Sequence, residues 1–140
     1  SDQMTRFMIT LEQGIELVWH ALDDMVGGEI YVRRIPSMKV TDIARAVSAG
    51  AKQEIVGIRP GEKVHEQMIG VDDAPYTYEY PDYYKILPAI HEWSTDPARI
   101  KDGRAVPPGF SYASDTNPEW MTIDTLRAWI AQNQASIGQF

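Results

Sequence analysis

The stretch from residue 10 to residue 28 restricts the fold most strongly, because it predicts one long amphipathic helix. Thr10 stands three residues before Gln13, which is the spacing of a capping box at a helix start. The pair Gly27-Gly28 supplies the stop. Between these signals, apolar residues recur at helical spacing: Leu11, Ile15, Val18, Leu22 and Met25. We expect this stripe, together with Trp19, to face the core, and His20 to lie on the helix surface.

Short elements are expected around this helix. They are an extended segment at 4–9, a strand at 29–32 with Ile30 and Val32 inward, and a strand at 54–58. Between the two strands, after Pro36-Ser37, we expect a helix that Gly50 ends and that carries Val40, Ile43, Ala44 and Val47. The resulting order is β-α-β-α-β, in units that are typical of a small mixed α/β layer.

In the second half of the chain, prolines and glycines separate the expected elements into short segments. Residues 64–69 fit a short helix or a strand equally well. Two Tyr-rich runs, 76–80 and 83–87, suit a hairpin, although tyrosines of this kind could also stack on a base or sugar. Residues 95–110 predict a loop, with disorder as an open alternative. Thr122 can cap a last helix that places Ile123, Leu126 and Ile130 on one face.

Length and charge limit the classes of protein that the chain can belong to. At 140 residues it is expected to form one domain with a real core. The net charge of −7 argues against a nucleic-acid binder, which needs a basic face. Residues 1–65 hold eight Lys/Arg against nine Asp/Glu, and residues 66–140 hold five against eleven, so an anionic ligand approaches the first half more easily. The absence of Cys and of an apolar span of about 20 residues leads us to expect a cytoplasmic protein.

A turn at Arg59–Glu62 offers the clearest binding chemistry. Pro60 presets φ near −65° and Gly61 accepts a positive φ, so a type II turn is predicted. From such a turn, the guanidinium of Arg59 could grip phosphate oxygens, and the carboxylate of Glu62 could accept both hydroxyls of a ribose. The alternative is a surface turn whose charges are only solvated.

No catalytic machinery is visible in the sequence. The three histidines, His20, His65 and His91, have no partner at i+4, so no helical metal pair is expected. The chain also has no Gly-rich phosphate loop, no Gly-x-Ser-x-Gly nucleophile motif and no Tyr-x-x-x-Lys pair.

Several linked motifs carry a family resemblance over about the whole chain. They are Met4-Thr5-Arg6-Phe7-x-Ile9-Thr10, Gly28-Glu29-Ile30, Ile35-Pro36-Ser37-Met38-Lys39, Gly57-Ile58-Arg59-Pro60-Gly61-Glu62-Lys63-x-His65-Glu66, and Ser114-Asp115-Thr116-Asn117 before Trp120. In this order they resemble the C-terminal half of the inverting UDP-N-acetylglucosamine 4,6-dehydratases. These enzymes form part of the polysaccharide-biosynthesis branch of the extended short-chain dehydrogenase/reductases.

The resemblance implies a division of labour in a larger lyase. An N-terminal Rossmann domain, absent from this chain, would hold NADP and the catalytic Tyr and Lys, while this portion would close over the UDP-sugar. Arg6 and Arg59 would bind the diphosphate, Glu62 the ribose, and Thr5 would line the same pocket. This chain would then contain no catalytic residue, cofactor site or metal site, and it would be inactive alone. The product of the whole enzyme would be a 4-keto-6-deoxy sugar nucleotide inverted at C5.

Simpler roles and other assignments stay open. Arg6 could instead neutralise Asp2 or Glu12, and Glu62 could pair with Lys63 or Arg59. The chain could be a stand-alone nucleotide-sugar or protein-binding module, or a fragment of a related epimerase or reductase. If a Rossmann domain normally covers the first helix and the surface around Arg6, the isolated chain should expose apolar area there and form homo-oligomers.

Overall fold

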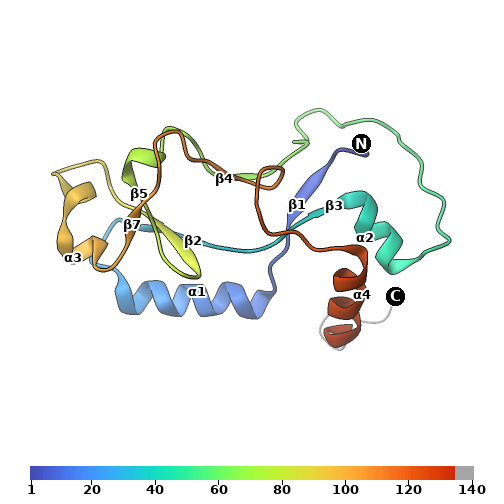
Figure 1. The fold of residues 1–140 in the computed structure, drawn as a ribbon, viewed down its shortest axis with the longest axis horizontal. Coiled ribbons are helices and arrows are strands. Elements are labelled where there is room, and N and C mark those ends of the chain that lie inside the picture. The colour runs from blue at the N-terminus through green and yellow to red at the C-terminus, as the bar shows by residue number, and fades with distance from the viewer. Residues whose placement is uncertain (135–140) are drawn as a thin grey trace. The chain divides into compact units, whose positions relative to one another are not determined.

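The computed structural model describes residues 1–134 and builds them from short helices and strands (Figure 1). The strands are β1 (Thr5–Phe7), β2 (Ile30–Arg33), β3 (Ser37–Lys39), β4 (Gln67–Ile69), β5 (Thr77–Glu79), β6 (Tyr83–Ile86), β7 (Arg104–Ala105) and β8 (Tyr112–Ala113). The helices are α1 (Leu11–Asp24), α2 (Val40–Val47), α3 (Pro97–Ile100) and α4 (Ile123–Gln132), with 3₁₀ turns η1 (Ala74–Tyr76) and η2 (Trp93–Thr95). The expected small mixed α/β class is confirmed at this level.

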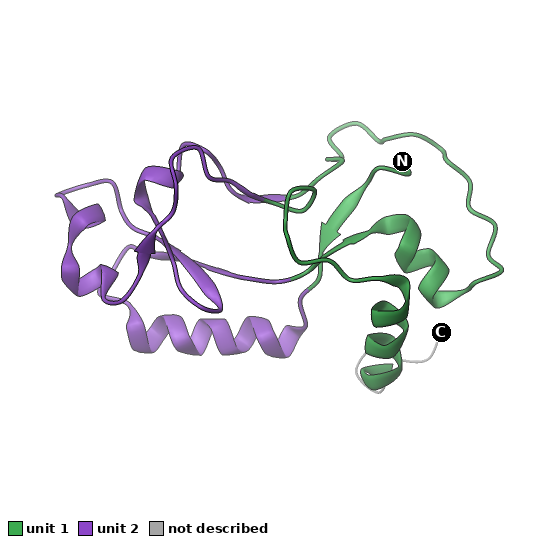
Figure 2. Ribbon diagram, viewed as in Figure 1, with its two compact units in different colours: residues 1–8, 36–66, 113–140 green, residues 9–35, 67–112 purple. Residues whose placement is uncertain are grey.

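The chain forms two compact units, coloured separately in Figure 2. Unit 1 contains residues 1–8, 36–66 and the chain from residue 113 onward, and unit 2 contains residues 9–35 and 67–112. The expectation of a single domain stays a prediction. None of the helices within residues 1–134 combines the length and the apolar character that crossing a bilayer requires.

Unit 2 is built on a four-stranded antiparallel sheet in the order β2-β6-β5-β7. The neighbours β5 and β6 form the hairpin that the two Tyr-rich runs predicted, with Thr77 opposite Ile86 and Glu79 opposite Tyr84. Apolar and aromatic side chains from this sheet and its flanks are buried: Val32, Ile69, Tyr80, Tyr84, Leu87 and Tyr112. Here the tyrosines cover a small core.

Helix α1, which belongs to unit 2, begins as the sequence predicted, but the face that it buries is a different one. The Thr10 hydroxyl accepts from the Gln13 N–H, and the Gln13 side chain accepts from the Thr10 N–H, so the capping box is confirmed. The prediction that the apolar stripe lies in the core is wrong. Its members are all exposed: Leu11, Ile15, Val18, Trp19, Leu22 and Met25.

The more buried face of α1 carries a mixture of polar and apolar residues instead. Gln13, Leu17, Ala21 and Asp24 follow each other at helical spacing and are all partly buried. This face is held by polar contacts, since Arg33 donates to the Gln13 carbonyl and also pairs with Glu16 at 3.2 Å. His20 is exposed, as predicted for a residue on the helix surface, and its ring also contacts those of Tyr31 and Tyr83.

A buried charge pair fastens the last turn of α1 to the sheet. Lys85 on β6 is 1% exposed and its Nζ lies 2.5 Å from Asp24 Oδ2. Lys101 also binds Asp24, and the Tyr31 hydroxyl donates to it at 2.7 Å. Burial raises the pKa of Asp24, but the hydrogen bonds from Lys101, Lys85 and Tyr31 outweigh it and hold this pKa well below its usual range. In the same cluster, burial first and the nearby Asp24 charge second raise the pKa of Tyr83 to about 12.

Unit 1 is organised around the short antiparallel pair β1-β3, in which Thr5 lies opposite Lys39 and Phe7 opposite Ser37. Ser37 also forms a parallel bridge with Trp120, and the Asn117 amide donates to its hydroxyl. Helices α2 and α4 join this core, where Leu126 is fully buried. The last helix is capped as predicted, since the Thr122 hydroxyl accepts from the Thr125 N–H.

Three further expectations need correction. Residues 54–58 form no strand (Figure 1). Ile55 and Val56 are exposed. Ile30 is 58% exposed, so only Val32 of the expected inward pair is buried. Residues 95–110 are no plain loop, since they contain α3 and β7.

Two signals explain the last correction. The Asp96 side chain accepts from the Ala98 N–H and Pro97 opens the helix, which together make a helix start too short to show periodicity. In the ambiguous stretch 64–69, residues 67–69 form strand β4, which pairs with β8, and residues 64–66 form no helix or strand.

Candidate functional site

The turn at Arg59–Glu62 is present as the sequence predicted. The Glu62 N–H donates to the Arg59 carbonyl at 3.0 Å, which is the i+3 to i bond of a β-turn. Gly61 has φ +80°, the positive value that a type II turn requires at its third position. A residue with a Cβ would be strained there. The turn is therefore fixed by its own sequence.

The two proposed ligand groups of the turn differ in how they are engaged. One carboxylate oxygen of Glu62 accepts from the Arg59 N–H at 3.1 Å, so this side chain adds a second hydrogen bond between the two ends of the turn. Both residues are exposed, and within residues 1–134 the guanidinium of Arg59 has no ion-pair partner. The expected alternatives, Glu62 paired with the Lys63 or Arg59 side chain, are not formed among these residues.

Arg6 holds the end of the loop that carries the turn. Its Nη1 donates to the Thr5 carbonyl at 2.7 Å and to the Val64 carbonyl at 3.1 Å. Its Nε lies 3.6 Å from Glu66 Oε1, so Glu66, rather than Asp2 or Glu12, is the carboxylate that pairs with Arg6. Folding thus brings Arg6 from β1 to the end of the loop, two residues beyond Glu62.

Backbone bonds fasten the same loop end to β1. The Thr5 N–H donates to the Val64 carbonyl at 3.0 Å, and the Phe7 N–H donates to Glu66 Oε2 at 2.8 Å. Residues 64–66 therefore lie along β1 without forming a regular strand. The turn is held at one end by a fixed segment, while the 48–58 stretch before it contains no helix or strand.

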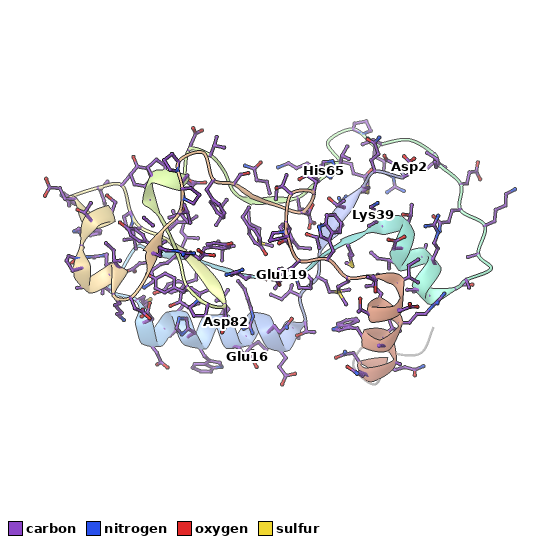
Figure 3. The ribbon with its side chains drawn as sticks, viewed as in Figure 1. Asp2, Glu16, Lys39, His65, Asp82 and Glu119 are labelled. Carbon is purple, nitrogen blue, oxygen red and sulfur yellow. The ribbon has the colours of Figure 1, made fainter. Side chains whose placement is uncertain are left out.

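A buried cluster of hydroxyls joins three distant segments at this point. Thr5 Oγ1 lies 2.7 Å from His65 Nδ1 and 2.7 Å from Ser114 Oγ. Ser114 Oγ accepts from the Glu66 N–H at 2.9 Å, and the Ser114 N–H donates to the Glu66 carbonyl at 2.8 Å. Thr5 is 4% and Ser114 0% exposed, whereas His65 is half-buried beside β1 (Figure 3).

The sequence located part of this arrangement. It marked Thr5, Arg6, Arg59 and Glu62, and the structure ties the first two to the end of the loop that bears the other two. It noted Ser114–Asn117 without assigning a contact, and it missed His65 and Glu66. No local pattern could pair Thr5 with Ser114, which are 109 residues apart. A common contact of Thr5, Arg6, Arg59 and Glu62 with one ligand stays a prediction.

Metal chemistry has no evident place in the part of the chain that the structure describes. Across residues 1–134, no group of three or more His, Cys, Asp or Glu side chains is arranged to hold a metal ion. The groups at the loop and β1 are a guanidinium, a carboxylate, hydroxyls and an imidazole. Such groups bind phosphate and hydroxyl oxygens.

Comparison with known proteins places the chain in a family. A family described as polysaccharide biosynthesis protein matches residues 1–88, which include β1, the turn and Glu66. The chain belongs to this polysaccharide biosynthesis family. The match covers most of the motifs that carried the sequence resemblance, which is confirmed.

Relatives of this polysaccharide biosynthesis chain include two enzymes from Campylobacter jejuni. The chain is 46% identical over 130 residues to the UDP-N-acetylglucosamine 4,6-dehydratase (inverting) of serotype O:2, and 45% identical to that of serotype O:23/36. Each alignment covers 89% of this chain and 39% of the relative, so the chain spans well under half of their length. A UDP-glucose 4-epimerase from Rickettsia canadensis is 32% identical over 87 residues, covering 59% of this chain and 26% of the epimerase.

A solved structure shares the fold. The X-ray structure of Pen from Bacillus thuringiensis superposes with a TM-score of 0.80 at 25% sequence identity. The superposition covers 96% of this chain and 40% of Pen. The arrangement of this polysaccharide biosynthesis chain therefore recurs as one part of a longer chain.

Proposed function

We propose that this chain is the UDP-sugar-binding C-terminal portion of an NADP-dependent, C5-inverting UDP-N-acetylglucosamine 4,6-dehydratase. The enzyme would work in the cytoplasm, in the synthesis of bacterial surface polysaccharide or another glycan. The main support is the identity of 46% to an inverting dehydratase, spread over 89% of this chain. The bonds that hold Arg6 at the loop of Arg59 and Glu62 add a physical reason.

In this proposal the chain binds and encloses the substrate. Arg59 and Arg6 neutralise the diphosphate, because guanidinium groups give paired, charge-assisted hydrogen bonds to phosphate oxygens. Glu62 accepts hydrogen bonds from the ribose hydroxyls through the carboxylate oxygen that its own turn leaves open. Thr5 supports the same pocket from β1. Binding the nucleotide far from the reacting carbons supplies energy for orientation and for excluding water.

The redox chemistry is assigned to the part of the longer protein that lies outside this chain. NADP, held there, would supply reversible hydride exchange with the sugar. The residues of this chain offer no Gly-rich loop for a dinucleotide and no Tyr-x-x-x-Lys pair for proton transfer.

A related sugar-nucleotide epimerase is the second candidate. Its support is the 32% identity to a UDP-glucose 4-epimerase, but that alignment covers only 59% of the chain. Both candidates bind a UDP-sugar and so predict the same use of Arg59 and Glu62. A stand-alone binding module is a third candidate, and it differs by needing no partner domain.

Titration of the chain with UDP, followed by NMR, tests the binding role. We expect weak, saturable shifts at residues 59–66, which Arg59→Ala and Glu62→Gln reduce. Lys52→Ala is the matched control, because it removes an exposed positive charge from the same connection without touching the turn. If the Lys52 and Arg59 variants lose the same amount of UDP binding, the binding depends only on positive charge and not on the turn. This result would contradict the proposal.

A further inference from the structure

The hydrogen bonds that join Ser114, Thr5 and His65 can be assigned a donor-to-acceptor direction by counting the available protons. Ser114 Oγ already accepts the Glu66 N–H, and its only other partner among the described residues is Thr5 Oγ1. The single hydroxyl proton of Ser114 must therefore point at Thr5. The single hydroxyl proton of Thr5 is then left for His65 Nδ1, which lies 2.7 Å away.

The opposite direction leaves a buried proton unpaired. If His65 carried its proton on Nδ1, Nδ1–H would donate to Thr5, and Thr5 would donate to Ser114. The Ser114 hydroxyl proton would then have no acceptor among residues 1–134, in a side chain that is 0% exposed. An unsatisfied buried donor carries the full cost of its desolvation, so the first direction is preferred.

We propose that Ser114 and Thr5 hold His65 as the Nε2–H tautomer, so that His65 presents a neutral N–H donor to the nucleotide. A neutral imidazole has one donor and one acceptor nitrogen, and the chain of hydroxyls uses the acceptor. The donor nitrogen is left for a ligand oxygen. His65 lies three residues after Glu62 and directly after Val64, whose carbonyl binds Arg6. It thus lies in sequence between Val64 and Glu66, the two residues of the loop end that Arg6 contacts.

This inference adds one ligand residue and one positioning residue to the proposed function, and the ligand part rests on that function. Ser114 contacts no ligand in it. It acts through Thr5 on His65, and through the Glu66 backbone on the end of the loop.

Histidine tautomers can be read directly by ¹⁵N NMR of the full chain. Pyrrole-type and pyridine-type ring nitrogens have well-separated shifts, and spectra taken under mildly alkaline conditions report neutral rings. The chain has three histidines, so His20 and His91 are internal references, and His65→Gln assigns the third signal. We expect a protonated Nε2 and an unprotonated Nδ1 at His65.

Two variants of Thr5 separate the hydroxyl from the shape of the side chain. Thr5→Val keeps the volume of a 4% exposed side chain and removes the donor, so His65 should become a mixture of tautomers. Thr5→Ser keeps the donor and should retain the wild-type pattern. Ser114→Ala should also mix the tautomers, and Ser48→Ala, at an exposed serine, should change nothing. Amide dispersion shows in the same samples that each variant is folded.

Addition of UDP then tests the contact with ligand. Bound UDP should shift the Nε2 signal of His65, and Thr5→Val should weaken binding about two- to tenfold. A wild-type Nδ1–H tautomer, or identical His65 spectra for Thr5→Val and Thr5→Ser, would overturn the tautomer assignment. Shifts at residues 59–62 without any change at His65 Nε2 would overturn the ligand contact alone. If no residue responds to UDP, the proposed function fails with the contact, while the unliganded spectra still decide the tautomer.

Discussion

Arg6 and Arg59 are both proposed to bind diphosphate, but the structure uses them differently. Arg6 gives two N–H bonds from Nη1 to carbonyls and lies beside Glu66, so much of its guanidinium already serves the fold. Arg59 contributes its backbone to the turn and leaves its guanidinium exposed. Replacing the two residues should therefore have separable effects on stability and on affinity.

Arg59→Ala is expected to weaken substrate binding by the longer enzyme by about 1.5–3 kcal/mol, the range for hydrogen bonds to charged groups. Its thermal stability should stay close to wild type, because exposed surface substitutions usually change stability by less than about 0.5 kcal/mol. NADP binding should be unchanged. Calorimetric titration with UDP and with NADP checks both statements.

Arg6→Ala should lose affinity and also about 1–2 kcal/mol of stability, since two partly buried hydrogen bonds to carbonyls go with it. Chemical denaturation compares the two arginine variants directly. If Arg6→Ala is as stable as Arg59→Ala, the structural role of Arg6 is wrong.

At the residue scale, local chemistry was predictable and long-range pairing was not. The turn follows from Pro60 and Gly61 alone, and the capping box follows from Thr10 and Gln13. The bond from Thr5 to Ser114 joins segments with no shared periodicity. Ser114 lies in a polar stretch that is typical of a turn, so the sequence gives no sign that its side chain is buried.

Helix α1 is held at its last turn by charge rather than by its apolar stripe. The Lys85 ammonium is fully enclosed, with Asp24 as its counter-ion and the Arg99 carbonyl at 2.8 Å as a further acceptor. Breaking such a pair from one side leaves a buried charge uncompensated, which typically costs about 3–5 kcal/mol.

Asp24→Asn is therefore expected to destabilise the chain by about 3–5 kcal/mol near neutral pH. Asp23→Asn is the matched control, because Asp23 is the exposed neighbour on the same helix. Chemical denaturation measures both. A loss in Asp24→Asn no larger than in Asp23→Asn would mean that the pair is not a structural anchor.

The pair of Asp24 and Lys85 also predicts how the free energy of unfolding changes at acid pH. The pKa of Asp24 is lowered on folding, so the unfolded chain takes up its proton first as the pH falls. Its stabilisation is fully present above the unfolded value of 3.8 and is lost as the pH falls below it. Wild type should thus lose more stability than Asp24→Asn between pH 6 and pH 3. Parallel curves for the two proteins would contradict this assignment.

At the element scale, sequence patterns predicted where helices lie better than they predicted which helix face is buried or which segments pair as strands. Caps and spacing predicted α1, α2 and α4, but the stripe of α1 gave the wrong buried face, because buried ion pairs can hold the polar face of a helix inward. Residues 54–58 have the composition of a strand and form none. Strand propensity reflects packing on a sheet surface, and these residues have no paired strand among residues 1–134.

For the whole molecule, the exposed apolar face of α1 is the feature most relevant to association. Five large apolar side chains of α1 are exposed. Ile9, Leu11, Ile15, Val18 and Trp19 line one apolar hollow with Thr10 and Gly14. Contiguous apolar surface of this kind commonly marks an interface. If the chain is part of a longer enzyme, as proposed, we expect the rest of that enzyme to cover this face.

The isolated chain should consequently self-associate. Val18→Lys should shift sedimentation toward the monomer, because it places a charge in the apolar face. Ala49→Lys is the control, as it adds the same charge at an exposed position outside α1. A wild-type chain that stays strictly monomeric at high concentration would remove the support for a covered interface.

The chain alone should also be inactive. Mixed with NADP and UDP-N-acetylglucosamine it should form no 4-keto product, because the proposed nicotinamide site and proton-transfer groups lie elsewhere. Product above a no-protein blank, measured by its carbonyl chemistry, would place catalytic groups within these residues.

The two compact units are interleaved along the chain, with boundaries after Met8, Ile35, Glu66 and Tyr112. Neither unit is a contiguous segment, so neither can be excised by one cut. During synthesis on a ribosome, the hydrogen bond between Thr5 and Ser114 cannot form until Ser114 has been made, 109 residues after Thr5. At about 5–20 residues per second, that delay is about 5–20 s. Unit 1 therefore depends on contacts between segments that are distant in sequence, and the bond from β1 to Ser114 can form only after this delay.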